Sequence, residues 1–140
     1  MAKGTINHLA LTVRDLAKSE AAFYGPVLGF LGYDKVEDIP EMMTLWFNAE
    51  AKFAVNLWQA RPPLAAQPHA RYAPGFHHCA LDVDSRAEVD VLHALLREKN
   101  IKVLDAPAEY PQSAPGYYAV YFEDPDGLKF EAVHMPEVPA

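Results

Sequence analysis

The chain carries the same short histidine-bearing segment twice, 70 residues apart, and this repeat constrains its fold more than any other feature. One copy reads His8-Leu-Ala-Leu-Thr-Val13 and the other reads His78-Cys-Ala-Leu-Asp-Val83. In the first copy three apolar residues at alternate positions share one face, and the histidine lies on the other, as the two-residue period of a strand requires. The two histidines are therefore expected at equivalent places on two equivalent strands.

A helix and three strands are predicted to follow the first histidine strand. That strand covers residues 6–13, and Asp15 is placed to cap a helix over residues 15–24. Gly29 and Gly32 are expected to mark the exit from the helix. The three following strands are predicted over residues 33–37, 43–48 and 53–59. The first half of the chain is therefore predicted to be βαβββ.

The second half repeats this order after a linker rich in proline and alanine. The pattern restarts at Phe76, and Ser85 and Glu88 have the spacing of a capping box before a helix over residues 85–99, with Asn100 as its stop. Strands are predicted over residues 101–106, 117–123 and 128–134. We therefore predict one α+β domain, residues 1–140, of two tandem βαβββ modules whose mixed sheet curves around a metal-binding cavity. Module one covers about residues 4–60, the linker about 61–75 and module two about 76–135.

The repeat extends to the closing strands of the two modules. Laying residues 53–56 on residues 128–131 gives Asn56 the place that Glu131 holds in the other half. The same alignment puts Trp46 and Phe47 on Tyr121 and Phe122. Asn56 is therefore expected to point into the same cavity as Glu131.

Two histidines and one glutamate make a candidate metal site. His8 and His78 open their strands, and Glu131 follows the tight turn of residues 124–127 on the last strand. Imidazole and carboxylate ligands suit divalent zinc, nickel, manganese or iron, and three such ligands leave positions free for water or substrate. Any one of these residues alone is more often an ordinary strand or surface residue. Their matched places in an internal repeat favour one divalent metal ion per site.

For three residues near this candidate site the sequence predicts less specific roles. His77 is predicted to face the helix side of the sheet, as a packed or rim histidine, because it alternates with His78. Tyr121 is expected either to enter the cavity as a hydrogen-bond donor or to pack as one more aromatic residue. Cys79 is expected to face the core and to be inert.

The composition of the chain argues against some binding partners and some cellular compartments. The formal net charge of −7, without a lysine or arginine cluster, argues against a nucleic-acid partner. No run reaches the roughly 18 apolar residues needed to span a membrane, and the first residues lack the apolar core of a secretory signal. A single cysteine, Cys79, excludes an internal disulfide framework and suits a reducing cytoplasm.

The repeated motifs resemble those of one known superfamily. The duplicated H-x-A-L-x-V strands, Phe23-Tyr24 with residues 28–30, and the closing run Phe122–Glu131 are similar to the vicinal oxygen chelate superfamily. That superfamily includes glyoxalase I, glyoxalase-like proteins, fosfomycin-resistance thiol transferases, bleomycin-binding proteins, methylmalonyl-CoA epimerase and extradiol dioxygenases. The resemblance covers nearly the whole chain and implies paired βαβββ modules.

The resemblance also implies roles for individual residues. It gives His8, His78 and Glu131 as the metal ligands, with no residue assigned to an organic cofactor. Tyr121 and Asn56 become polar contacts to the substrate or to a metal-held water. The chain departs from glyoxalase I at Asn56, because that enzyme has a second glutamate there and an amide cannot act as a general base.

The resemblance implies three functions, of which a metal-dependent enzyme is the first. Such an enzyme would be a lyase, isomerase or transferase whose metal ion chelates a small oxygen-bearing substrate. A thiol such as glutathione is a candidate partner. The second hypothesis is a non-catalytic small-molecule or antibiotic-binding protein of the bleomycin-resistance kind. The third is an extradiol-type dioxygenase. Small members commonly dimerise, so we expect a homodimer, in which His8 can face His78 and Glu131 of the partner subunit.

Overall fold

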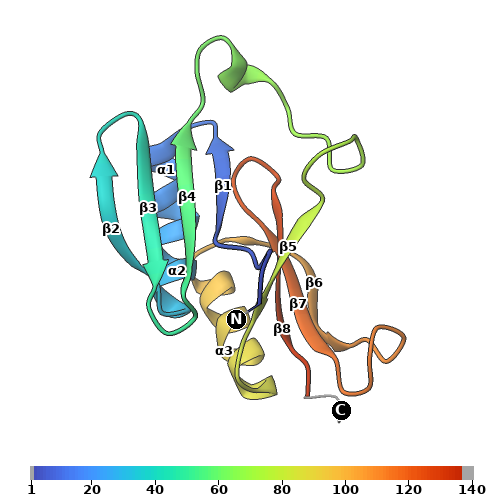
Figure 1. Ribbon diagram of the computed structural model, residues 1–140. Coiled ribbons are helices and arrows are strands. Elements are labelled where there is room, and N and C mark those ends of the chain that lie inside the picture. Colours follow the sequence, from blue (N-terminus) through green and yellow to red (C-terminus); the bar gives the residue numbers. More distant parts are fainter. Residues whose placement is uncertain (1, 137–140) are drawn as a thin grey trace. The chain divides into compact units, whose positions relative to one another are not determined.

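The computed structural model describes residues 2–136 and divides the chain into two compact units, Met1–Gln67 and Pro68–Ala140. The boundary lies inside the predicted linker, residues 61–75. Each unit has its own four-stranded sheet (Figure 1). No helix among residues 2–136 is long and apolar enough to cross a membrane.

The first unit has helical segments against one mixed sheet. Its sheet order is β1-β4-β3-β2, with β1 parallel to β4 and the other pairs antiparallel. In Figure 1 the helical segments lie behind the sheet. The elements are β1 (His8–Val13), α1 (Leu16–Ser19), the π-helical turn η1 (Glu20–Tyr24), α2 (Gly25–Phe30), β2 (Asp34–Ile39), β3 (Met43–Asn48), β4 (Phe53–Gln59) and a short 3-10 turn, η2 (Leu64–Ala66).

The first helix is longer than predicted, because it continues through Gly25 and Pro26 to Phe30 instead of ending at Tyr24. A π turn makes this possible, since the Gly25 N–H donates to the Glu20 carbonyl five residues back. A Cβ at position 25 would lie 2.8 Å from that carbonyl oxygen, so the close approach requires glycine. Pro26 then falls at the start of the next helical segment, where its missing N–H costs little.

The second unit has the same topology. Its sheet order is β5-β8-β7-β6, with β5 parallel to β8, and α3 contacts β6, β7 and β8. Its elements are β5 (His78–Asp82), α3 (Arg86–Glu98), β6 (Lys102–Glu109), β7 (Tyr118–Glu123) and β8 (Lys129–His134). The prediction of an α+β fold with two tandem βαβββ modules is confirmed.

The ends of α3 follow the predicted signals. The Ser85 hydroxyl accepts from the Glu88 N–H at 3.1 Å, and the Glu88 carboxylate accepts in return from the Asp84 N–H at 2.7 Å. Asn100 has a φ of 57°, the left-handed conformation that stops a helix. Val89, Leu92 and Leu96 are each 0 % exposed, so this helix face forms much of the core of the unit.

Strand register shows how closely the two units match. Asn56 lies between Ala10 and Leu45, and Glu131 lies between Ala80 and Tyr121, so Asn56 and Glu131 occupy equivalent places. The predicted match of Trp46 to Tyr121 is wrong by one residue, because Leu45 is the true counterpart of Tyr121. The cause is the turn between the paired strands, which spans residues 49–52 in one unit and the longer 124–128 in the other.

Candidate functional site

Glu131 is the most buried carboxylate of the second unit and the centre of its polar cluster. It lies in the middle of β8 with 1 % of its surface exposed. Its register partners, Ala80 and Tyr121, share its face, and alternation puts Phe130 and Ala132 on the opposite face. A buried carboxylate is costly unless it is hydrogen-bonded, paired or bound to a metal ion. The partners of Glu131 therefore decide what this site can do.

The two oxygens of Glu131 have different partners. The Tyr117 hydroxyl donates a short hydrogen bond to Oε2, while Oε1 lies 3.4 Å from His78 Nε2. Burial and the hydrogen bond to Glu131 raise the pKa of Tyr117, so its proton stays on the phenol. Burial, followed by the charge of Glu131, raises the pKa of Tyr121 to about 12. Both phenols are therefore neutral donors beside a single negative charge.

His78 is held in a definite orientation by its neighbour. His78 Nδ1 lies 2.6 Å from His77 Nδ1, which requires one ring to donate and the other to accept. Partial desolvation, and then the positive charges near it, lower the pKa of His77, so it suits the accepting role. The tautomer in which His78 Nδ1 donates to His77 leaves a lone pair on Nε2, the atom that lies 3.4 Å from Glu131 Oε1. A histidine that binds a metal ion commonly holds its other nitrogen in this way.

The prediction that His77 faces the helix side is wrong. His77 is exposed, and its ring lies edge-on to Tyr72 at 5.1 Å and to His78 at 4.9 Å. It precedes β5, which begins at His78, so strand alternation does not apply to it. Cys79 is partly buried, and burial raises the pKa of its thiol, as expected for an inert cysteine.

His8 has the same local arrangement in the first unit. It opens β1, is exposed, and its Nδ1 lies 2.8 Å from the Asn7 side-chain oxygen, which can only accept. Its Nε2 is therefore also left with the lone pair. Among residues 2–136, neither unit by itself places three histidine, cysteine or carboxylate side chains close enough together to hold a metal ion. The second unit brings His78 and Glu131 together, and His8 belongs to the first.

Asn56 is engaged within its own sheet. Its Nδ2 donates to the Thr44 carbonyl at 2.9 Å, and its Oδ1 accepts from the Trp58 indole N–H. Only 7 % of Asn56 is exposed. Its amide therefore bridges β3 and β4 and fixes Trp58, and a role in contacting substrate has to compete with these bonds.

The sequence analysis missed the basic groups of the site and did not pair Tyr117 with Glu131. Its predicted strand over residues 117–123 puts Tyr117 on the face of Tyr121, whereas β7 begins at Tyr118 and Tyr117 lies in the loop before it. Lys129 pairs with His78 in register, and its Nζ lies 4.6 Å above the centre of the Tyr121 ring. Arg71 bonds the Glu123 carboxylate at 2.9 Å, and its charge also acts on His77. The second unit therefore has basic groups beside the candidate ligands.

These residues fit a divalent metal ion. Each histidine can present a lone pair on Nε2 while its Nδ1 bonds a neighbour, and the buried Glu131 carboxylate has two phenols and an imidazole beside it. Nitrogen and oxygen donors of this kind suit zinc, nickel, manganese or iron.

Known proteins resemble this chain along most of its length. Residues 5–132 match the family model described as Glyoxalase/Bleomycin resistance protein/Dioxygenase superfamily. The chain is 30 % identical over 128 residues to the uncharacterized protein YqjT of Bacillus subtilis (strain 168), covering 91 % of this chain and 97 % of that one. It is 31 % identical over 128 residues to the metallothiol transferase FosB of Lysinibacillus sphaericus (strain C3-41), covering 91 % and 79 %.

Solved structures show the same fold. A Bacillus halodurans protein assigned to the glyoxalases superimposes with a TM-score of 0.80 at 27 % identity, over 94 % of this chain and 96 % of that one. The lactoylglutathione lyase of Agrobacterium tumefaciens superimposes with a TM-score of 0.68 at 24 % identity, over 95 % of both chains. The chain therefore belongs to the glyoxalase/bleomycin resistance protein/dioxygenase superfamily.

Proposed function

We propose that this chain is a metal-dependent lyase, isomerase or transferase whose small substrate binds through its oxygens. One observation carries the proposal: the buried Glu131 carboxylate faces the Nε2 of His78 at 3.4 Å, with each residue held from behind by a neighbour. His78 and Glu131 would hold one divalent ion, zinc, nickel, manganese or iron. His8, of the same chain or of a second copy in a homodimer, would complete the set.

The residues around the ligands define what the site favours. When bound, a divalent ion supplies a Lewis acid that stabilises negative charge developing on a substrate oxygen. Tyr117 orients Glu131, and Tyr121 offers a neutral hydroxyl on the same face. Lys129 adds a positive charge beside Tyr121, which favours a substrate with an anionic group.

The reaction class follows from what the site lacks as well as from what it has. Asn56 provides no base in the first unit, so isomerisation of the glyoxalase I kind lacks its second carboxylate. Transfer of a thiol such as glutathione, the class indicated by the name of the FosB relative, needs no such carboxylate. We therefore place thiol transfer ahead of isomerisation.

The single free cysteine is consistent with a place in the cytoplasm.

Metal analysis of protein purified without added metal tests the proposal. We expect about one divalent ion per chain in the wild type, and its loss in His78→Ala and His8→Ala. His93→Ala, on α3, is the control. Mixing the His8→Ala and His78→Ala proteins then locates His8: recovered metal means a site shared between two chains. Wild-type protein that stays metal-free in the presence of nickel and zinc would instead support the non-catalytic binding protein.

A further inference from the structure

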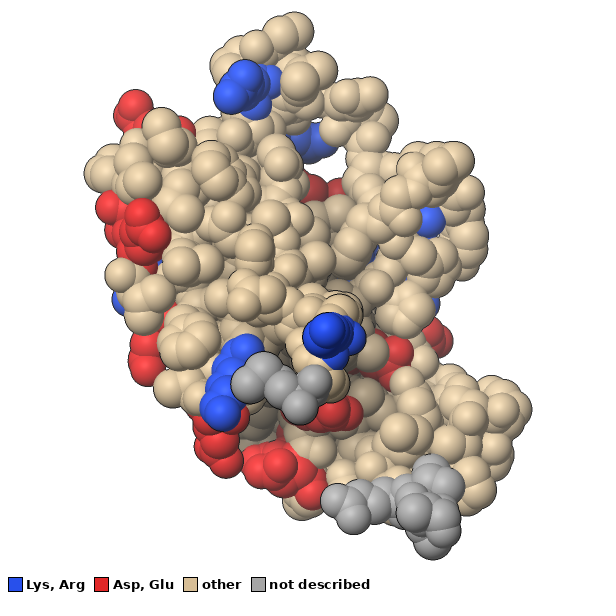
Figure 2. All heavy atoms as spheres, viewed as in Figure 1, with Lys and Arg blue, Asp and Glu red and all other residues tan. Residues whose placement is uncertain are grey.

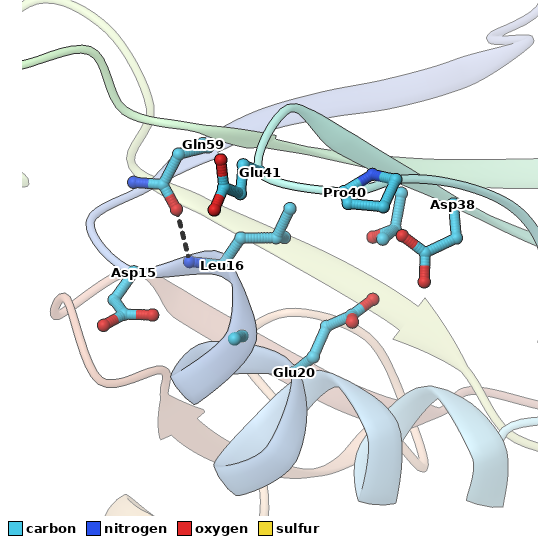
Figure 3. A pocket seen from close by; sticks show the side chains of 9 residues that line it. Asp15, Leu16, Glu20, Asp38, Pro40, Glu41 and Gln59 are labelled. Carbon is cyan, nitrogen blue, oxygen red and sulfur yellow. Dashed lines mark hydrogen bonds between the residues drawn. The ribbon is translucent and has the colours of Figure 1, made fainter.

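The first unit contains a cavity that the proposed metal chemistry does not use. It has a volume of about 540 Å³ and lies where α1 and η1 meet β2, β3 and β4 (Figure 3). Thr44 pairs with Leu57, whereas the neighbouring Leu45 pairs with Asn56, so the cavity opens on the face opposite to Asn56. Its lining residues are Asp15, Leu16, Ala17, Glu20, Asp38, Pro40, Glu41, Thr44 and Gln59.

The lining of this cavity is strongly acidic. It contains four carboxylates and no lysine or arginine. In Figure 3 Asp15 and Asp38 lie at opposite ends, with Glu20 and Glu41 between them on facing sides. The acidic character continues outside, because exposed carboxylates follow the β2 edge of the unit (Figure 2). This field attracts cations toward the cavity.

One internal cation neutralises part of this charge. Lys35 bonds Glu20 Oε1 at 3.1 Å and Asp38 Oδ2 at 3.3 Å, and the hydrogen bond to Glu20 is the main cause that raises the Lys35 pKa. The other Glu20 oxygen accepts from the Trp46 indole N–H at 2.8 Å. Asp15 Oδ1 accepts from the Lys18 N–H at 3.1 Å, as the cap of α1. Four carboxylates against one ammonium leave an excess of negative charge around the cavity.

A buried hydroxyl in the same wall lacks a partner. Thr44 is 1 % exposed, and its Oγ1 makes no hydrogen bond with any residue among 2–136. Buried polar groups without a partner are rare, and such a group calls for a bound molecule or another specific explanation. Because Thr44 lines the cavity, a polar group placed there is the partner that the fold offers.

We propose that this cavity binds an aliphatic diamine, with ammonium groups toward the carboxylates at its two ends and its carbon chain along Leu16, Ala17 and Pro40. The acidic lining disfavours an anion. A bare metal ion does not fit, because no group of three potential ligands converges among residues 2–136. The site is independent of His78 and Glu131, which belong to the other unit.

Calorimetric titration of the full chain with 1,4-diaminobutane tests this proposal. We expect saturable binding that weakens with added salt, and no binding of 1-butanol. Asp38→Asn should weaken binding about tenfold, since it removes the charge-assisted contact at one end of the cavity. Glu37→Gln is the matched control, because Glu37 lies on the same strand but pairs with Leu45 on the other face. The fluorescence of Trp46, measured in a Trp58→Phe variant, should change when the diamine contacts Glu20, because the Trp46 indole donates to Glu20.

Thr44→Val separates binding from folding. Valine keeps the shape and removes the unpaired hydroxyl, so the melting temperature without ligand should stay the same or rise, while diamine affinity falls. Three results would overturn the proposal: no heat of binding at millimolar diamine, equal losses in Glu37→Gln and Asp38→Asn, or a lowered melting temperature in Thr44→Val with unchanged diamine affinity.

Discussion

The hydrogen bond from Tyr117 to Glu131 gives the sharpest stability prediction. Tyr117→Phe removes the hydroxyl that donates to Glu131 Oε2, on a carboxylate that is 1 % exposed. Leaving a buried acceptor unsatisfied costs about 1–3 kcal/mol, and a charged acceptor belongs at the upper end. We therefore expect the free energy of unfolding of metal-free protein to fall by about 2–3 kcal/mol, measured by urea denaturation with a chelator at neutral pH.

A neighbouring residue supplies the matched control for this prediction. The Tyr118 hydroxyl donates to Asp90 Oδ1 at 2.6 Å, which is the same chemistry at an exposed carboxylate. Tyr118→Phe should change stability by no more than about 0.5 kcal/mol. The effect of Tyr117→Phe should also shrink in a Glu131→Gln background, since an amide carries no charge to be left unpaired. If Tyr117→Phe unfolds like Tyr118→Phe, the reasoning about the buried carboxylate is refuted.

Three further predictions concern the rest of the chain. Leu96→Ala should destabilise by about 2–5 kcal/mol, because Leu96 is fully buried, while Glu98→Ala should be nearly neutral; equal denaturation midpoints would contradict the phase of α3. Asn56→Glu should lower the stability of the metal-free protein, because the variant loses the hydrogen bond to the Thr44 carbonyl, and it should raise the affinity for a divalent metal ion. An unchanged affinity in a folded variant, measured by calorimetry, would place this side chain away from the metal. The Cys79 thiol should react slowly with a disulfide reagent at pH 8, because burial raises its pKa and lowers the thiolate fraction; a rate like that of a free thiol, followed by absorbance, would show that it is accessible.

Much of the fold could be predicted because local and repeated signals agree. The strands Met43–Asn48 and Phe53–Gln59 have the predicted bounds, since turns flank each of them. The capping residues Ser85 and Glu88 predicted the start of α3. The repeat also predicted that Asn56 and Glu131 are equivalent, which the strand register confirms.

The errors arise where the conformation depends on contacts that no local pattern encodes. The helix was predicted to end at Tyr24, yet one π turn carries it through Gly25 and Pro26. The alignment of Trp46 with Tyr121 failed because one turn has an extra residue, and a shift of one residue exchanges the two faces of a strand. The Thr44 hydroxyl faces a cavity formed by packing, so it is not visible from spacing.

The central claim is that Glu131 and His78 hold a divalent metal ion, and calorimetric titration of metal-free protein with nickel or zinc tests it most directly. We predict one ion per chain for the wild type, and an affinity at least about tenfold lower for Glu131→Gln, whose amide keeps the shape but not the charge. Circular dichroism should show that both proteins are folded. Equal affinities for wild type and Glu131→Gln, at the same chelator concentration, would contradict the claim and remove Glu131 from the site.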